Sequence, residues 1–340
     1  MFNHLYIASF FILLGCSKSS SPVQDPVEPP ELLPVRVVNV STVSELMDAL
    51  SQSVPGDEIR IADGTYKGKF VIPAGRNGTA QRFISLTGSG NVILDAENIN
   101  TGYVLHLQSS YWRIKGFTIT NGLKGLMVDG SRFSEIDGLN IHNIGEEGIH
   151  LRKFSSNNII RNCMITDLGL KTPDYGEGIY IGSAKNNWTV YTLGQPDLCD
   201  SNKVLNNYIG PGITAECIDI KEGTTATLIS GNTFDATGIT GANGGDSWID
   251  VKGNYTKVEN NTGINPGGNI FLDGYQTHVA VSGWGNYNTF RNNICAVNGQ
   301  GYGFNIQLSG SNGTSTGNKV YTSNTVSGAV KGISNIPLSN

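Results

Sequence analysis

The sequence predicts an all-β fold, a single-stranded parallel β-helix (solenoid) with a capping helix at its N-terminal end. Three observations lead to this prediction. One short phrase recurs along most of the chain, asparagines fall in register with it, and an amphipathic segment precedes its first copy. The chain of 340 residues suffices for one large domain, which we place at residues 35–340.

The recurring phrase is an apolar pair, two polar residues and a second apolar pair, as in "WRIKGFTITN" at 112 and "NKVLNNYIGP" at 202. Its first apolar residue returns every 22 to 32 residues, apart from one gap of 44 that holds a long insertion. This period is typical of one β-helix coil, whereas a propeller blade needs about 40 to 50 residues. A β-sandwich has no reason to keep a constant period. The markers are Ile114, Ile136, Ile160, Val204, Ile229, Val258, Phe290 and Val320.

Asparagines stand three places after four of these markers, at Asn207, Asn232, Asn261 and Asn293. Stacked coils would place them one above the other. We expect a ladder in which each side-chain amide bonds the next, so that a polar residue is tolerated inside the stack.

The segment 41–53, "STVSELMDALSQS", has the apolar spacing of an amphipathic helix and begins with Ser and Thr start signals. Val43, Leu46, Met47 and Leu50 would form its apolar face. An open solenoid end exposes core and strand edges, so we expect this helix to cover it.

The N-terminal segment has the features of a processing signal. Residues 1–15 contain a short apolar run, and Leu-Leu-Gly-Cys ends at Cys16 as in a bacterial lipobox. We expect Cys16 to be lipidated and residues 16–34, rich in Ser and Pro, to form a tether. The protein would then be anchored in the cell envelope of a bacterium, at the outer membrane or cell surface. The alternative is an ordinary secretory signal with an incidental cysteine.

The composition argues against several classes of function. Charged residues make up 15% of the chain and the net charge is −5, so no basic surface for nucleic acid is expected. No cysteine pattern indicates a metal site or a disulfide framework. We expect a monomer with buried thiols at Cys163, Cys199, Cys217 and Cys295.

A second strand in each coil carries most of the chemistry. "ECIDIKE" at 216 and "SWIDVKG" at 247 both alternate apolar residues with an acid and a base. With the apolar residues inward, two outward columns emerge. The first runs Met127, His150, Tyr180, Asp219, Asp250, His278, Asn305, and the second Asp129, Arg152, Gly182, Lys221, Lys252, Ala280, Gln307. Glu147, Glu177, Glu216 and Asp246 open these strands at the edge.

Two interpretations of this charged wall remain open. Asp219 with Lys252, and Asp250 with Lys221, could be cross-strand ion pairs on a solvated sheet. Against this, histidines, a tyrosine and an arginine join the same wall. Long inserts at 169–176, 183–200, 236–246 and 264–276 occur in these coils and carry Tyr175, Trp188 and Tyr191, on which sugar rings could stack. Asp219, Asp250, Trp188 and Tyr191 are therefore candidate substrate-binding residues.

The repeat, the "DGTY" segment at 63–66 and the spacing of Glu216 and Lys221 resemble right-handed parallel β-helix polysaccharide lyases, closest to the alginate lyase and chondroitinase B family. The resemblance covers about residues 55–330. It implies that Glu216 binds calcium and that Lys221 is the catalytic base. Thr214 stands where that family has a second acid, and Lys252 is nearest to its arginine.

Lyase chemistry suits the wall. β-Elimination on an acidic, uronate-containing polysaccharide needs a cation at the carboxylate, a base for the C5 proton and a proton for the leaving oxygen. Lys252 or Arg152 would supply the cation and Lys221 the base. Tyr180, His150 or His278 would supply the proton. Calcium would be held by Glu216 with Glu177, Asp219 or Asp250.

Three other functions remain open at this point. A glycoside hydrolase could use Asp219 and Asp250, which adjacent coils would place near the roughly 5 Å of a retaining pair. A uronate epimerase would share the proton abstraction. A non-catalytic glycan-binding lipoprotein would use the same wall without chemistry.

Overall fold

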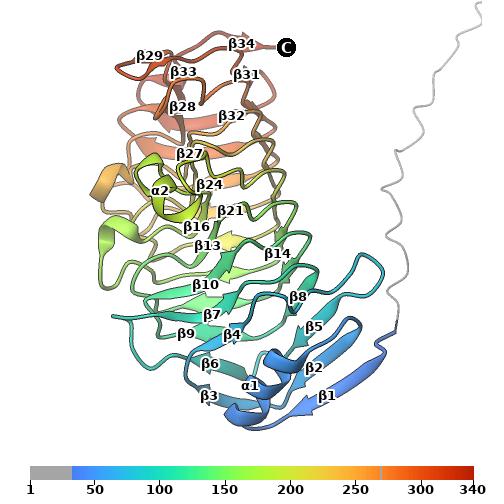
Figure 1. Cartoon of the computed structure of the whole chain (residues 1–340). Helices are drawn as coiled ribbons and strands as arrows, with labels where there is room; N and C mark the ends of the chain where they lie inside the picture. The colour runs from blue at the N-terminus through green and yellow to red at the C-terminus, as the bar shows by residue number, and fades with distance from the viewer. Residues whose placement is uncertain (1–32, 269) are drawn as a thin grey trace, which may run out of the picture. The chain divides into compact units, whose positions relative to one another are not determined.

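The computed structural model describes residues 33–268 and 270–340, and Pro34–Asn340 form one compact unit. This unit is a right-handed parallel β-helix, as predicted (Figure 1). The processing signal, Cys16 and nearly all of the tether lie outside the described residues. Within the described part, no helix is both long enough and apolar enough to cross a membrane.

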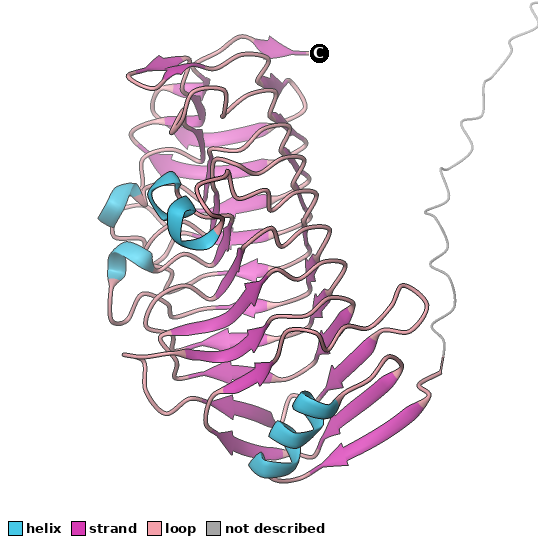
Figure 2. Ribbon diagram, viewed as in Figure 1, coloured by secondary structure: helices cyan, strands magenta, loops and turns pink. Residues whose placement is uncertain are grey.

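Each coil passes through three parallel sheets in turn, which we name sheets 1, 2 and 3 (Figure 2). Sheet 1 comprises β1 (Arg36–Val40), β2 (Asp57–Ile61), β5 (Ile84–Thr87), β8 (Trp112–Lys115), β11 (Glu135–Asp137), β14 (Ile159–Arg161), β17 (Lys203–Leu205), β20 (Leu228–Ser230), β23 (Lys257–Glu259), β26 (Thr289–Arg291), β31 (Lys319–Tyr321) and β34 (Leu338–Ser339). Sheet 2 comprises β3 (Gly64–Lys67), β6 (Val92–Asp95), β9 (Thr118–Thr120), β12 (Asn140–His142), β15 (Met164–Ile165), β18 (Tyr208–Ile209), β21 (Thr233–Asp235), β24 (Thr262–Ile264), β27 (Ile294–Gly299) and β32 (Thr325–Ala329). Sheet 3 comprises β4 (Phe70–Ile72), β7 (Tyr103–Leu107), β10 (Lys124–Asp129), β13 (Ile149–Arg152), β16 (Ile179–Ile181), β19 (Ile218–Ile220), β22 (Ile249–Val251), β25 (Tyr275–Thr277), β28 (Tyr302–Ile306) and β33 (Gly332–Ser334). A short antiparallel hairpin, β29 (Ser309–Gly310) with β30 (Gly313–Thr314), follows β28.

The predicted markers form one inward column of sheet 1. Ile114 pairs with Ile136, and the register continues coil by coil to Phe290 and Val320. All eight side chains are buried in the core. Burying a side chain of this size contributes about 1.5–3 kcal/mol, which explains why the apolar phrase recurs in every coil.

The asparagine ladder is also confirmed. The side-chain amide of Asn207 donates to Asn232 at 2.9 Å, and the same contact links Asn232 to Asn261 and Asn261 to Asn293. The ladder extends one coil further than predicted, to Asn324. A second pair, in which Asn158 donates to Asn202 at 3.2 Å, was not predicted because a 44-residue coil separates its members.

The predicted capping helix is α1 (Val43–Gln52). Thr42 accepts a hydrogen bond from the Glu45 backbone while the Glu45 side chain accepts one from the Thr42 backbone, which satisfies donors at the helix start. Leu46 and Leu50 are buried against the first coils, whereas Met47 is exposed and lies outside the apolar face. Strand β1, which precedes the helix, was not predicted.

The inserts flank the strands of sheet 3 and carry short helical turns: η1 (Pro173–Tyr175), η2 (Lys185–Asn187), α2 (Trp188–Tyr191) and η3 (Ala242–Gly244). Thr214 donates to the carbonyl of Pro173 at 2.9 Å, and Asn243 donates to that of Asp174 at 3.3 Å. The second contact joins inserts that are two coils apart, and Thr214 comes from the coil between them. The four described cysteines are free and buried, as expected.

Candidate active site

The charged wall is the outward face of sheet 3. Its first column is as predicted through Asp250, and inter-strand register joins His150 to Tyr180, Tyr180 to Asp219 and Asp219 to Asp250. Asn305 also stands in this column, as predicted. The wall is thus a set of side chains from consecutive coils, about 4.8 Å apart.

The assignment of His278 to the first column is wrong. Strand β25 places Gln276 opposite Asp250, and the His278 backbone donates to Val251, so His278 follows Lys252 in the second column in place of Ala280. The cause is that Tyr275 and Thr277, rather than the nearby valines, point inward. His278 still reaches the site, because its Nδ1 lies 2.7 Å from Asp250.

The edge of the wall differs at one coil. Glu147, Glu177 and Glu216 each stand three residues before their first-column residue, as predicted. In the coil of β22 that place belongs to Ser247, and Asp246 lies one residue earlier. There Asp246 accepts a hydrogen bond from Gln276 at 2.8 Å.

Lys252 lies between two carboxylates, 2.9 Å from Asp219 and 2.5 Å from Asp250. The expected pair of Asp219 with Lys252 is therefore present. The expected pair of Asp250 with Lys221 is wrong, because Lys221 contacts Asp219 of its own strand at 2.5 Å. All four residues are largely buried, so they differ from ion pairs on a solvated sheet.

These contacts hold the lysines charged. Burial lowers the pKa of Lys221, but the Asp219 carboxylate more than offsets this and the pKa lies above its usual range. The pKa of Lys252 is raised in the same way by Asp219 and Asp250 against burial. Burial raises the pKa of Asp250, yet Lys252 and His278 bring it below its ordinary value. The charge of Asp250 in turn raises the pKa of His278.

Three buried carboxylates form an acidic trio beside the lysines: Glu177, Glu216 and Asp219 each place one oxygen within 4.8 Å of the others. Burial, then the charge of Asp219, raises the pKa of Glu216 to about 8. Burial and neighbouring carboxylates also raise the pKa of Glu177. Its Oε2 is buried without a hydrogen-bond partner.

This donor set fits a hard divalent cation. Calcium prefers carboxylate oxygens at about 2.3–2.6 Å, and one ion can therefore bridge oxygens separated as they are in the trio. The unpartnered Glu177 oxygen is the atom that such an ion would satisfy. Asp250, proposed above as a further ligand, lies outside the trio.

Tyr180 stands beside Lys221, whose Nζ lies 4.8 Å from the centre of the phenol ring. On the other side, the His150 ring packs against Tyr180 with centroids 4.4 Å apart. Burial and the charge of Asp219 raise the pKa of Tyr180, which therefore keeps its proton at neutral pH. His150 is buried, with Nε2 3.1 Å from the Gly182 carbonyl and Nδ1 3.2 Å from Glu147, so it orients the Tyr180 ring.

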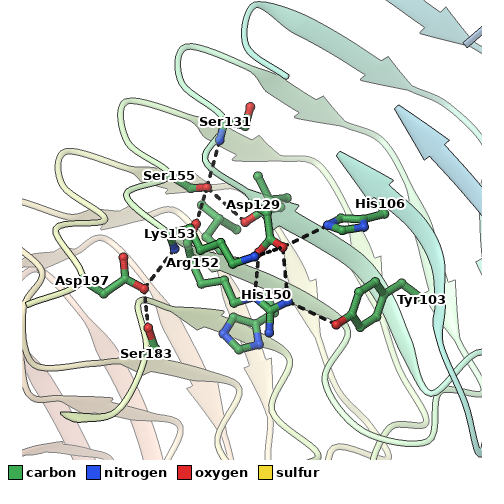
Figure 3. A network of polar contacts seen from close by, with 12 residues as sticks. Tyr103, His106, Asp129, Ser131, His150, Arg152, Lys153, Ser155, Ser183 and Asp197 are labelled. Carbon is green, nitrogen blue, oxygen red and sulfur yellow. Dashed lines mark hydrogen bonds and ion pairs between the residues drawn. The ribbon is translucent and has the colours of Figure 1, made fainter. Parts of the chain in front are cut away.

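Arg152 does not offer a free guanidinium. It is buried, its Nε and Nη2 donate to Asp129 at 2.6 and 3.2 Å, and Nη2 also reaches the Tyr103 hydroxyl at 3.1 Å (Figure 3). The Tyr191 ring lies 4.2 Å from the guanidinium carbon. The prediction that Arg152 binds a substrate carboxylate is therefore wrong, because the guanidinium N–H groups already donate to Asp129 and Tyr103. The sequence already placed Asp129 next to Arg152 in the predicted second column, so this pairing could have been anticipated as one candidate.

The insert 183–200 is held by Asp197, which sequence reasoning missed. Its carboxylate accepts hydrogen bonds from the backbone of Lys153 at 3.0 Å and Phe154 at 2.7 Å, and it contacts the Ser183 hydroxyl (Figure 3). Nothing in the local sequence marks Asp197, because the two backbone groups that it binds, those of Lys153 and Phe154, lie more than 40 residues earlier in the chain.

The aromatic residues of the inserts have different surroundings. Trp188 is buried and its indole N–H donates to the Ser183 carbonyl at 2.9 Å, so the prediction that it stacks on a sugar needs correction. Tyr191 is half-buried over Arg152, at the margin of the wall. Tyr175 is exposed on η1.

Known proteins with similar sequences or structures share the β-helix fold described above. The family model described as "Pel9A-like, right handed beta helix region" matches residues 37–167. An alginate lyase structure from Paenibacillus sp. str. FPU-7 is 41% identical, with 86% of this chain and 97% of that chain covered and a TM-score of 0.78.

Two more distant structures share the fold. Pectate lyase Pel9A is 14% identical, with 86% of this chain and 78% of that chain covered and a TM-score of 0.58. The PL6 family polysaccharide lyase Pedsa3628 from Pseudopedobacter saltans is 16% identical, with coverages of 80% and 66% and a TM-score of 0.52. A search of curated proteins found no match.

Proposed function

This chain belongs to the family of the Paenibacillus alginate lyase and is a polysaccharide lyase, and from that premise we propose that it cleaves a uronate-containing polysaccharide by β-elimination. Alginate is the first substrate to test, because it is the substrate named for the 41% identical relative. The observation that carries the proposal is the buried pairing of Lys221 with Tyr180 on the wall.

The reaction needs one proton removed and one supplied. The C5–H bond of the uronate breaks, its electron pair forms the C4=C5 double bond, and the C4–O bond breaks. We assign Lys221 Nζ to take the C5 proton and the Tyr180 hydroxyl to give a proton to the leaving oxygen. The raised pKa of Tyr180 suits a proton donor.

The substrate carboxylate needs cationic partners that face outward. Lys252 stands in the column beside Lys221, and His278 follows it with a side chain 41% exposed. We assign these two residues to the carboxylate in place of Arg152, whose guanidinium is engaged by Asp129 and Tyr103 and lies under the Tyr191 ring. Asp219 and Asp250 orient the lysines.

Lys221 must lose its own proton before it can act, and Asp219 opposes this. We propose that the acidic trio of Glu177, Glu216 and Asp219 holds calcium. A bound divalent cation would supply positive charge beside Lys221 and so favour the neutral amine. The donor set and the unpartnered Glu177 oxygen support this assignment.

A hydrolase that uses Asp219 and Asp250 is disfavoured. Such an enzyme needs one carboxyl that carries a proton at working pH. Lys252 lies between the two carboxylates, and the pKa of Asp250 is below its ordinary value, so Asp250 is not poised to donate a proton.

We also propose anchoring to the bacterial cell envelope through a lipid on Cys16. The Leu-Leu-Gly-Cys sequence and the Ser- and Pro-rich segment after it support this. Mass spectrometry of protein from its native membrane would give a diacylated N-terminal cysteine. A mature N-terminus beyond Cys16 would contradict it.

The experiment that tests the reaction is a substrate screen. Mature protein is incubated with alginate, pectate, glucuronan and glycosaminoglycans, and the ultraviolet absorbance of the unsaturated product is followed with and without chelator. Absorbance rising with one of these polymers supports the lyase proposal. New reducing ends without absorbance would overturn it in favour of hydrolysis.

A further inference from the structure

A column of residues in the left-handed conformation runs along the turn between sheets 3 and 1. Their φ angles lie between 55° and 60°. Each backbone N–H donates to the carbonyl just before the next member, as from Ala226 to Asn254 and from Tyr255 to Asn286, so the members stack coil upon coil. The corner column consists of Tyr111, Phe133, Asn157, Ser201, Ala226, Tyr255 and Tyr287, and Gly317, at a φ of 71°, continues it after Tyr287.

The turn itself does not require aromatic residues. Three successive coils meet the same backbone geometry with Asn157, Ser201 and Ala226. A bulky residue at positive φ is unfavourable, and glycine or asparagine is the usual choice. Tyr255 and Tyr287 therefore occupy positions that small or polar residues fill in the middle of the column, and Tyr111 and Phe133 form a similar stack at its other end.

These two tyrosines form an exposed platform. Their rings stack in parallel, with centroids 4.9 Å apart and planes 9° apart. Tyr255 remains 51% exposed and Tyr287 45% exposed, so about half of each residue's surface faces solvent. Exposed apolar surface that the core does not use is typical of an interaction site.

The platform adjoins the wall. Tyr255 follows Lys252 by three residues in the same coil, around the corner at which sheet 3 ends. A polymer that extends from the wall past Lys252 toward sheet 1 would therefore meet this corner. Aromatic rings pack well against the apolar faces of sugar rings. Because tyrosine has few rotatable bonds, the contact costs little side-chain conformational entropy.

We infer that Tyr255 and Tyr287 form a second polysaccharide-binding site, a ridge that holds the substrate chain outside the subsites where cleavage occurs. The inference rests on the proposed function for the chemistry of its ligand. The ridge contacts sugars beyond the cleaved unit, so it acts on long chains and leaves the shortest cleavable oligosaccharide unaffected.

The test uses the column's own residues as replacements. Tyr255→Ala with Tyr287→Ser copies Ala226 and Ser201, which the same turn already accommodates. Kinetics are measured on polymeric alginate and on the shortest alginate oligosaccharide cleaved. Affinity gel electrophoresis in gels that contain alginate, pectate or glucuronan measures binding by retarded migration, a readout other than product formation. Tyr208→Ala, an exposed tyrosine on sheet 2, is the matched control.

The double variant should raise KM for the polymer about five- to tenfold, leave kcat and the oligosaccharide kinetics unchanged, and lose gel retardation; Tyr208→Ala should match wild type. Unchanged KM and retardation would overturn the ridge, and so would equal losses on polymer and oligosaccharide. Wild-type protein that gives no unsaturated product but is retarded through Tyr255 and Tyr287 would refute the proposed reaction and leave the ridge standing. Absence of retardation by any polymer would refute the ridge.

Discussion

The ammonium group of Lys221 lies 4.8 Å from the centre of the Tyr180 ring, and both side chains belong to the outward face of sheet 3. This contact places a candidate base and a candidate acid side by side at one position of the wall. The two roles can be separated by substitution.

Lys221→Ala should lower kcat about 10²–10⁴-fold, as loss of a general base does. The fold should survive, because Asp219 keeps Lys252 as a partner at 2.9 Å. Ultraviolet absorbance measures turnover and circular dichroism the fold. Lys221→Arg should not rescue activity, since a guanidinium does not deprotonate. Near-normal turnover of Lys221→Ala would remove the residue from the base role.

Tyr180→Phe should lower kcat with little change in KM, because it keeps the ring on His150 and removes only the hydroxyl. The effect should be largest on substrates whose leaving group most needs a proton. Steady-state kinetics on polymer and oligosaccharide provide the measurement. If kcat is unchanged, another group protonates the leaving oxygen, and His278→Ala becomes the next variant to examine.

Lys252→Ala should raise KM and also destabilise the protein by about 3 kcal/mol, because it leaves the buried carboxylates of Asp219 and Asp250 without their shared cation. Lys252→Arg should recover part of both losses. Urea unfolding gives the free energy, with the exposed Lys257→Ala on sheet 1 as control. Wild-type stability in Lys252→Ala would show that the ion pairs are not energetically coupled to the fold.

The acidic trio predicts an unusual pH dependence of stability. The pKa of Glu216 is about 8 in the folded protein and about 4.5 as a free side chain, so between these values the folded state binds more protons than the unfolded state. The free energy of unfolding in chelator should therefore fall as pH rises from about 4.5 to about 8. Glu216→Gln should flatten this fall, and calcium should reverse it by binding the ionised carboxylates. Thermal unfolding at several pH values measures the trend; stability that rises across this window would contradict it.

Sheet 1 could be predicted from β8 to β31, because each coil in this stretch contributes one apolar marker, from Ile114 to Val320, in an almost constant phrase. Sheet 3 was harder, since its inward residues are less uniform. At β25 the Tyr275 ring stacks on Phe304 with centroids 5.0 Å apart. This contact places Tyr275 and Thr277 inward, where the sequence pattern had suggested Val279 and Val281. His278 was misplaced by two residues for that reason.

The candidate site was predictable as a set of residues but not as a set of contacts. The sequence placed Glu177, Glu216 and Asp219 on neighbouring coils, and the structure brings them into one trio. It could not rank the partners of Arg152, because its choice of Asp129 depends on side-chain geometry across two coils. Long-range partners such as Asp197 leave no local pattern to detect.

The asparagine ladder and the strand register also have a consequence for how this enzyme can diversify. The separation of Asp219 from Asp250 is set by hydrogen bonds between adjacent coils, whereas the inserts leave and rejoin the stack at its corners. Insert length and composition can therefore change outside anchoring residues such as Asp197 without altering the spacing of the reacting groups. Evolution or engineering can thus exchange the loops that select a polymer while the distances between the reacting side chains on sheet 3 stay the same.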